Sequence, residues 1–187
     1  MSDHMILPVF LYGSPVLRKV ATETPVGYPG LEEFISSLFE TMYQSDGVGL
    51  AAPQVGKSLR IFVIDASPLE EDDPSLKDFK KVFINPEIIS YEGDKSTYNE
   101  GCLSIPDIRE DVEREAAIRI RYCDTSFEYR EEYYEGIAAR IIQHEYDHLE
   151  GKLFTDRISP LKKRLLRRKL TSISKGKVDV KYRVKHL

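Results

Sequence analysis

Apolar residues recur at helical spacing in three parts of the chain. After a turn at residues 25–30, the first series predicts a helix that ends near residues 45–47; its apolar positions are Leu31, Phe34, Ile35, Leu38, Phe39 and Met42. A second helix is expected over about residues 134–149, with one side made by Ile137, Ile141, His144 and His148. A third should begin at Ser159-Pro160 and end near Ser174, because serine is a favoured N-cap and proline fits the first helical turn.

Short apolar or alternating segments predict strands between these helices. The candidates are residues 6–11, 60–65, 81–84, 87–91 and 116–123, with Asn85-Pro86 separating the third from the fourth. Residues 47–56 are small and irregular and predict a loop, and the acidic segment 67–81 predicts an exposed loop of unassigned role. Together the pattern favours an α+β fold, in which short-stranded antiparallel or mixed sheets pack around the helix at 134–149, with a helix near the C-terminus.

Length and composition change this picture little. A chain of 187 residues, 41% of them hydrophobic, is long enough for one compact domain, and we expect residues 1–187 to form one. No apolar run approaches the roughly 20 residues that span a bilayer, and the start at Met1–Met5 does not resemble a secretory signal. The two cysteines are too few for a disulfide framework, so we expect a cytoplasmic protein without a membrane partner.

Charge is distributed unevenly. Residues 160–187 contain eleven basic residues and one acid, a net charge of +10, so the other 159 residues carry −14. A basic helix and tail on an acidic body indicate either an anionic partner or a solvated helix face, and charge alone does not choose between them.

The segment Gln143–His148 contains the pattern H-E-x-x-H. Residues four apart share a helix face, so His144 and His148 can bind one metal ion while Glu145 reaches a water on that ion as a general base. The alternative is a pair of surface histidines on a charged helix. Against it, two of the four histidines stand here at ligand spacing, and the apolar residues of the same helix predict that it is largely buried.

A catalytic metal of this kind usually has a third protein ligand. A downstream glutamate is excluded because none follows Glu150, and the longer pattern ending in a third histidine has Phe154 at that position. Cys102 remains, either as a thiolate ligand or as a small buried residue, which is the interpretation we prefer for Cys123. A metalloendopeptidase and an inactive structural metal module are the competing functions.

Three segments resemble the peptide deformylase family in the family's order: Gly47-Val48-Gly49-Leu50-Ala51-Ala52-Pro53-Gln54, Glu100-Gly101-Cys102-Leu103-Ser104, and Gln143–Gly151. The resemblance extends from about Ile6 to the helix after Pro160. It implies an amide hydrolase that removes the formyl group from the N-terminal methionine of nascent polypeptides and releases formate.

The resemblance also implies the roles of single residues. Cys102, His144 and His148 would bind one divalent metal, which is Fe²⁺ in the family, although two imidazoles and a thiolate also suit Zn²⁺, Ni²⁺ or Co²⁺. Glu145 would be the catalytic acid and base. The Gln54 amide and the Leu103 backbone N–H would point at the formyl oxygen, where negative charge develops.

The substrate would lie against the first motif. Gly47 and Gly49 would allow a close approach of the peptide, and Arg109 would contact its backbone. The methionine pocket would include Val48, Tyr98 and Ile137. Arg140 stands where relatives often have an apolar residue, so the pocket shape is left open.

Two further expectations concern neighbours of these motifs. Glu100 and Arg114 are expected to form a supporting ion pair, and Asp147 either orients a histidine or is a plain surface acid. In bacterial relatives the last helix docks on the ribosome near the nascent-chain exit, and the basic tail suits ribosomal RNA there.

Overall fold

The computed structural model describes residues 5–186. Its main sheet has five antiparallel strands in the order β2-β3-β4-β5-β6. The strands are β2 (Gly49–Ala51), β3 (Ile61–Asp65), β4 (Lys80–Cys102), β5 (Ile105–Cys123) and β6 (Tyr129–Glu135). The expected α+β class is confirmed, but β4 and β5 are much longer than the short strands predicted.

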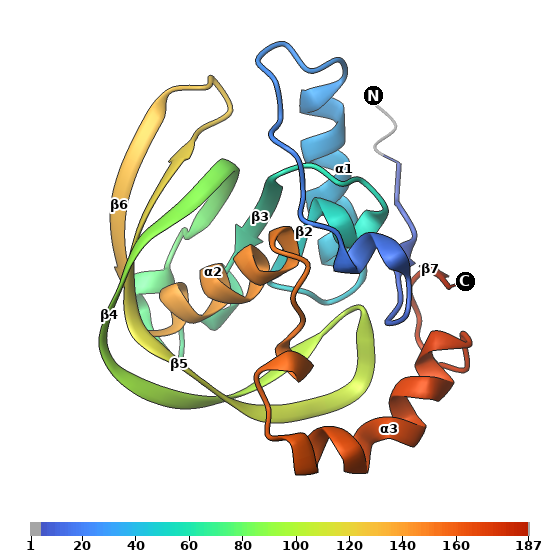
Figure 1. The fold of residues 1–187 in the computed structure, drawn as a ribbon. Coiled ribbons are helices and arrows are strands. Elements are labelled where there is room, and N and C mark those ends of the chain that lie inside the picture. Colours follow the sequence, from blue (N-terminus) through green and yellow to red (C-terminus); the bar gives the residue numbers. More distant parts are fainter. Residues whose placement is uncertain (1–4, 187) are drawn as a thin grey trace.

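The long strands β4 and β5 form a curved hairpin that closes at the turn Leu103-Ser104 (Figure 1). Asn85-Pro86 does not break β4, contrary to the prediction. Asn85 takes a positive φ of 50°, and the register with β5 shifts between Ile84 and Glu87. A bulge of this kind absorbs a residue that cannot donate to the ladder, such as Pro86, without ending the strand.

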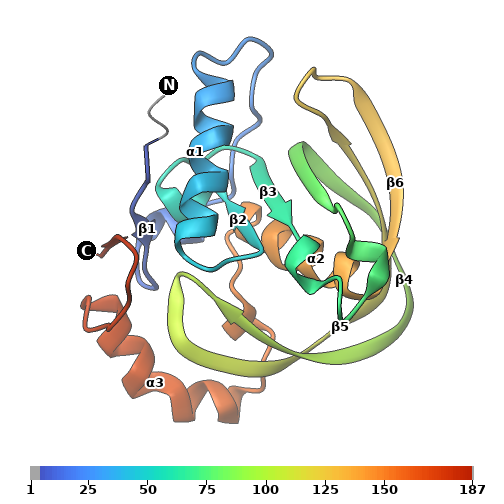
Figure 2. The same cartoon turned by 180° about the vertical axis from the view of Figure 1, so that it is seen from behind.

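Two helices pack on this sheet. The helix α2 (Gly136–Leu149) lies within the curve of β4 and β5, and α1 (Leu31–Gln44) stands beside β2 and β3 (Figures 1 and 2). Ile118, Ile120 and Ile142 belong to the apolar cluster between the sheet and α2. A second cluster includes Leu38 and Val63 and fixes α1. Burial of these faces is the main stabilising contribution.

The two ends of the described chain meet in a small second sheet. The strand β1 (Val9–Phe10) pairs in parallel with β7 (Val184–Lys185). Before β7, the helix α3 (Pro160–Ser174) begins as predicted, because Ser159 Oγ accepts the Lys162 N–H at 3.3 Å. Short 3₁₀ helices complete the chain at Pro15–Arg18, Ala52–Val55, Ser67–Leu69, Pro74–Leu76 and Phe154–Asp156.

The three predicted helices and the strand at 60–65 are confirmed. Residues 47–56 are not a loop, because they contain β2 and a 3₁₀ helix, and β6 was not predicted. The segment 67–81 is only partly exposed: it forms two 3₁₀ helices and buries Leu76 completely. Within residues 5–186, no helix combines the length and apolar character that crossing a bilayer requires. The expectation about the chain start concerns mainly Met1–His4, which lie outside the described residues.

Candidate metal centre and active site

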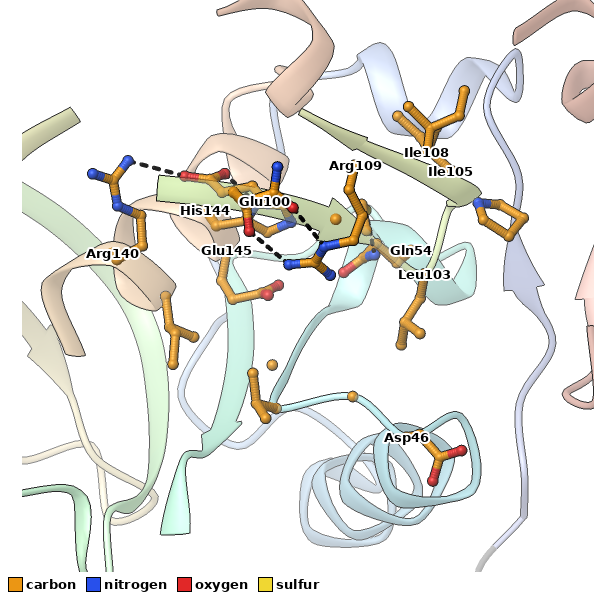
Figure 3. Close-up of a pocket in the computed structure, with 18 of the residues that line it drawn as sticks. Asp46, Gln54, Glu100, Leu103, Ile105, Ile108, Arg109, Arg140, His144 and Glu145 are labelled. Atoms are coloured by element: carbon orange, nitrogen blue, oxygen red, sulfur yellow. Dashed lines mark hydrogen bonds and ion pairs between the residues drawn. The ribbon is translucent and has the colours of Figure 1, made fainter. Parts of the chain in front are cut away.

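A cavity of about 610 Å³ opens where the hairpin turn, α2 and residues 46–54 meet. Figure 3 shows Gln54, Leu103 and Glu145 around this space, each from a different element. Every site residue predicted from the sequence lines it except His148, which is buried behind the others. The three segments, far apart in the chain, therefore form one site.

Three side chains can hold a metal ion: Cys102 and His144 line the cavity, and His148 is buried next to them. Cys102 ends β4, and His144 and His148 lie on one face of α2. The ligand atoms of all three residues lie within 4.8 Å of one another, and Cys102 Sγ is 3.4 Å from His148 Nε2. One thiolate and two imidazoles form a donor set suited to a tetrahedral divalent ion. Among the described residues, this is the one group of His, Cys, Asp and Glu side chains with such geometry.

The orientation of His144 is fixed by a carboxylate. Its Nδ1 lies 2.9 Å from Glu100 Oε2. Because an ionised carboxylate only accepts hydrogen bonds, Nδ1 carries the proton and Nε2 keeps its lone pair for a metal. Burial disfavours the charged carboxylate, but hydrogen bonds from Arg114 and His144 hold the pKa of Glu100 well below its usual value.

Arg114 joins the carboxylates of Glu100 and Asp147. Its guanidinium, fully buried, donates to Glu100 at 2.7 and 2.9 Å and to Asp147 at 2.8 Å. The expected Glu100–Arg114 ion pair is confirmed. Asp147 fits neither prediction made for it, because it is buried and accepts hydrogen bonds from Arg114 and Arg157 rather than from a histidine.

Glu145 lies beside the metal ligands without being grouped with them. Its carboxylate is buried, and Oε2 has no hydrogen-bond partner within residues 5–186. Burial raises the pKa of Glu145 to about 7. A carboxylate with an unused oxygen and a pKa near neutrality can both accept and return a proton.

Gln54 and Leu103, the two residues predicted to supply oxyanion donors, both line the cavity. Gln54 Oε1 accepts the Ala51 N–H at 2.9 Å, which turns Nε2 toward Cys102 Sγ at 3.5 Å and Ser104 Oγ at 3.2 Å. The backbone of Leu103 enters the hairpin turn directly after Cys102. Both donors are thereby held by backbone that the fold fixes.

The glycines of the first motif are required by neighbouring side chains. A Cβ on Gly49 would lie 2.5 Å from Glu145 Oε1, and one on Gly47 would lie 2.9 Å from Leu103 Cδ1. Both glycines also line the cavity. Their small size therefore admits Glu145 and Leu103, in addition to the close substrate approach expected from the sequence.

Val48, Ile137 and Tyr98 line the cavity and give it apolar surface. Arg140 also lines the cavity, but its guanidinium donates to Glu100, Ser96 and the Val112 carbonyl at 2.7–3.1 Å. Figure 3 shows the contact with Glu100. The charge is therefore bonded into the β4–β5 hairpin.

Arg109 lies at the rim of the cavity, where it donates to the Asn99 side chain at 2.9 Å and to the Asn99 carbonyl at 2.6 Å. Cys123 is half-buried in the cluster beside α1, and burial raises the pKa of its thiol.

Sequence reasoning missed several residues that line the cavity. Leu69 comes from the segment expected to be an exposed loop, and Val180 and Tyr182 come from the tail after α3. Ile141 carried a signal, because it lies three residues before His144 on the predicted helix. The tail residues carried none, since contacts over that sequence distance leave no local pattern.

A Cys-His-His group beside a buried carboxylate, open to a substrate-sized cavity with hydrogen-bond donors, defines a metal-dependent hydrolase. The polypeptide deformylase family model matches residues 6–164. A peptide deformylase from Flavobacterium johnsoniae is 53% identical, over 97% of this chain and 96% of that protein.

Solved structures agree with this family. A peptide deformylase from Legionella pneumophila has a TM-score of 0.80 and 38% identity, covering 92% of this chain and 98% of that one. One from Acinetobacter baumannii, solved with Met-Ala-Ser bound, has a TM-score of 0.75 and 34% identity, covering 83% and 99%. The chain belongs to the peptide deformylase family, and it is an enzyme that removes the N-terminal formyl group from nascent peptides with one divalent metal ion.

Replacing the sulfur ligand tests the metal centre. In Cys102→Ser the hydroxyl stays protonated at neutral pH and is a poor ligand, so we expect roughly tenfold or greater loss of divalent metal affinity. The measurement is metal content after dialysis against a graded chelator. Cys123→Ser is the matched control and should retain the wild-type content. Equal retention by both variants would contradict a thiolate ligand at Cys102.

Proposed function

We propose that Cys102, His144 and His148 are the three protein ligands and that Glu145, Gln54 and Leu103 carry out the reaction. The observation that supports this most directly is the convergence of one sulfur and two imidazole nitrogens within 4.8 Å. A divalent ion bound there would lower the pKa of a water molecule and polarise the formyl carbonyl.

The protein groups would then act in sequence on the formyl amide. Glu145 would take a proton from the attacking water on its carboxylate oxygen. As the formyl carbon becomes tetrahedral, Gln54 Nε2–H and the Leu103 N–H would donate to the developing oxyanion. Glu145 would deliver its proton to the leaving amine nitrogen, so that the C–N bond breaks and formate and the free amino terminus are released.

The remaining predicted residues would bind the peptide. The methionine side chain would contact Val48, Tyr98 and Ile137, while Gly47 and Gly49 would leave room for the substrate backbone. Arg109 would contact that backbone at the cavity rim, using donors not committed to Asn99. We also propose that residues 1–187 form a single catalytic domain, since strands of the one five-stranded sheet contribute residues to all three apolar clusters.

Removing the carboxylate tests the proton-transfer step. Glu145→Gln should lower turnover of formyl-Met-Ala-Ser by about 100-fold or more, because the amide cannot accept the proton. Metal content should be unchanged, because Glu145 is not proposed as a ligand. The matched control is Glu113→Gln, an exposed position on β5, which should turn over normally. Full turnover by Glu145→Gln would rule out this role.

The metal is proposed to be Fe²⁺, on the basis of the family alone, since the donor set also suits zinc, nickel or cobalt. Chain purified without oxygen should contain about one iron per molecule and release formate from formyl-Met-Ala-Ser. Metal analysis of the same sample decides the identity. Zinc as the principal metal of the anaerobic, active preparation would contradict the proposal.

We further propose that the outer face of α3 contacts ribosomal RNA near the nascent-chain exit. Arg164, Arg167, Arg168 and Lys169 are exposed on this helix and form no ion pair among the described residues. Deleting α3 would be a poor test of this contact, because the inner face of the helix belongs to the core. Leu170 and Ile173 are buried in the cluster against which Cys102 packs. Substitution of single charges is therefore preferable to truncation.

Neutralising part of this face should weaken ribosome binding and leave hydrolysis intact. For Arg164→Gln/Arg167→Gln/Arg168→Gln we expect weaker binding and a shallower dependence of log affinity on log salt, because fewer counterions are released. The control Lys19→Gln/Lys57→Gln/Lys77→Gln changes net charge equally elsewhere on the surface. Equal ribosome affinity of the two triple variants would remove α3 as the contact.

A further inference from the structure

The segment after α3 returns to the active site. It is held to the body by β7, through the bonds from Val9 N–H to the Arg183 carbonyl and from Leu11 N–H to the Lys185 carbonyl, both 2.8 Å. Val178 and Val184 pack on the same apolar cluster as Cys102. The family match ends at residue 164, so this segment lies outside the matched region.

Tyr182 in this segment reaches the hairpin turn. Its hydroxyl donates to the Leu103 carbonyl at 2.8 Å, and its side chain is half-buried at the cavity wall beside Val180. Leu103 is the residue whose N–H is proposed to stabilise the oxyanion. The Leu103 carbonyl lies in the peptide plane that follows its Cα, and the Leu103 N–H lies in the plane that precedes it. Tyr182 holds the first plane and the pairing of Cys102 with Ile105 holds the chain on the other side, so together they limit the φ and ψ rotations of Leu103 that would turn its N–H.

The small β1–β7 sheet supports both carbonyls of this turn. The Leu103 carbonyl accepts from Tyr182, just before β7, and the Ser104 carbonyl accepts from Tyr12 N–H at 2.8 Å, just after β1. Gln54 Nε2 adds a third contact at Ser104 Oγ. Turns exposed to solvent do not need such support, whereas an oxyanion donor must be held in place before the reaction.

We propose that Tyr182 is a positioning residue of the deformylation reaction, which holds the Leu103 N–H toward the oxyanion from the C-terminal segment. The inference rests on the proposed role of the Leu103 N–H. Tyr182 acts through the backbone of Leu103 and takes no part in proton transfer.

The variant Tyr182→Phe removes one hydroxyl and keeps the ring. We expect kcat for formyl-Met-Ala-Ser to fall about fivefold, the effect of losing one neutral hydrogen bond, with KM within about twofold of wild type. An interaction that matters only in the transition state lowers kcat without changing substrate binding. Affinity for the product Met-Ala-Ser, metal content and the thermal unfolding midpoint are measured on the same preparation, and rates are expressed per folded, metal-loaded chain.

Arg183→Ala is the matched control. It breaks a neighbouring tail contact, from Arg183 Nη1 to the Ile6 carbonyl at 3.0 Å, and leaves Tyr182 in place, so kcat should be unchanged. An equal fall of kcat in both variants would mean general loosening of the tail and would overturn the proposal. A wild-type kcat in Tyr182→Phe would also overturn the proposal. So would a joint rise of KM and of the Met-Ala-Ser dissociation constant at constant kcat, because that result would mean a role in substrate binding.

Gln54→Ala separates this inference from the oxyanion proposal on which it rests. If kcat is lowered in Gln54→Ala at unchanged metal content but not in Tyr182→Phe, oxyanion stabilisation stands and the role of Tyr182 is rejected. If neither variant loses kcat, oxyanion stabilisation by these donors is rejected, and the role of Tyr182 falls with it.

Discussion

The buried guanidinium of Arg114 determines how the metal centre is assembled. It comes from β5 and binds Glu100 on β4 and Asp147 on α2, so it joins the long hairpin to the helix. Cys102 lies two residues after Glu100, and Asp147 directly precedes His148. The ion-pair cluster therefore connects the strand that ends in the sulfur to the helix that carries the imidazoles. Loss of one partner would leave a buried charge uncompensated, which typically costs about 3–5 kcal/mol.

Features that depend on nearby residues could be predicted from the sequence, and features that depend on contacts between distant residues could not. The helices were predictable because apolar spacing and the Ser159 cap are local, and the H-E-x-x-H spacing fixes a shared face within one turn. The continuity of β4 across Asn85-Pro86 was not predictable, because it depends on pairing with β5 and on the Asn85 side chain. That side chain exchanges hydrogen bonds with the Thr24 backbone. The sequence alone left Cys102 open as a ligand, since its position beside α2 requires the whole hairpin to curve.

The first motif illustrates why a pattern can be recognised before its cause is known. Its glycines suggested a turn or a peptide-binding backbone, yet the closest neighbour of Gly49 is the carboxylate of Glu145. Burial raises the pKa of Glu145, and the absence of a side chain on Gly49 leaves the room that this carboxylate occupies. The room for Glu145 and the proposed room for the substrate thus depend on the same small residue. Arg140 shows the converse: its charge left the shape of the pocket open, but Glu100, Ser96 and Val112 bind its guanidinium.

The C-terminal region, made of α3 and the segment after it, packs one face against the core next to the active site and exposes the other face to solvent. Leu170 and Ile173 point inward to the cluster around Ile105 and Ile108, next to the hairpin turn, while the arginines of α3 face solvent. Beyond the helix, the chain pairs with β1 and brings Tyr182 to Leu103. The net charge of +10 over residues 160–187 left an anionic partner and a solvated helix face both open, and it gave no sign of the inner role. Because packing and hydrogen bonding connect this region to the turn that carries Cys102, a ribosome-docking surface here would also be part of the catalytic scaffold.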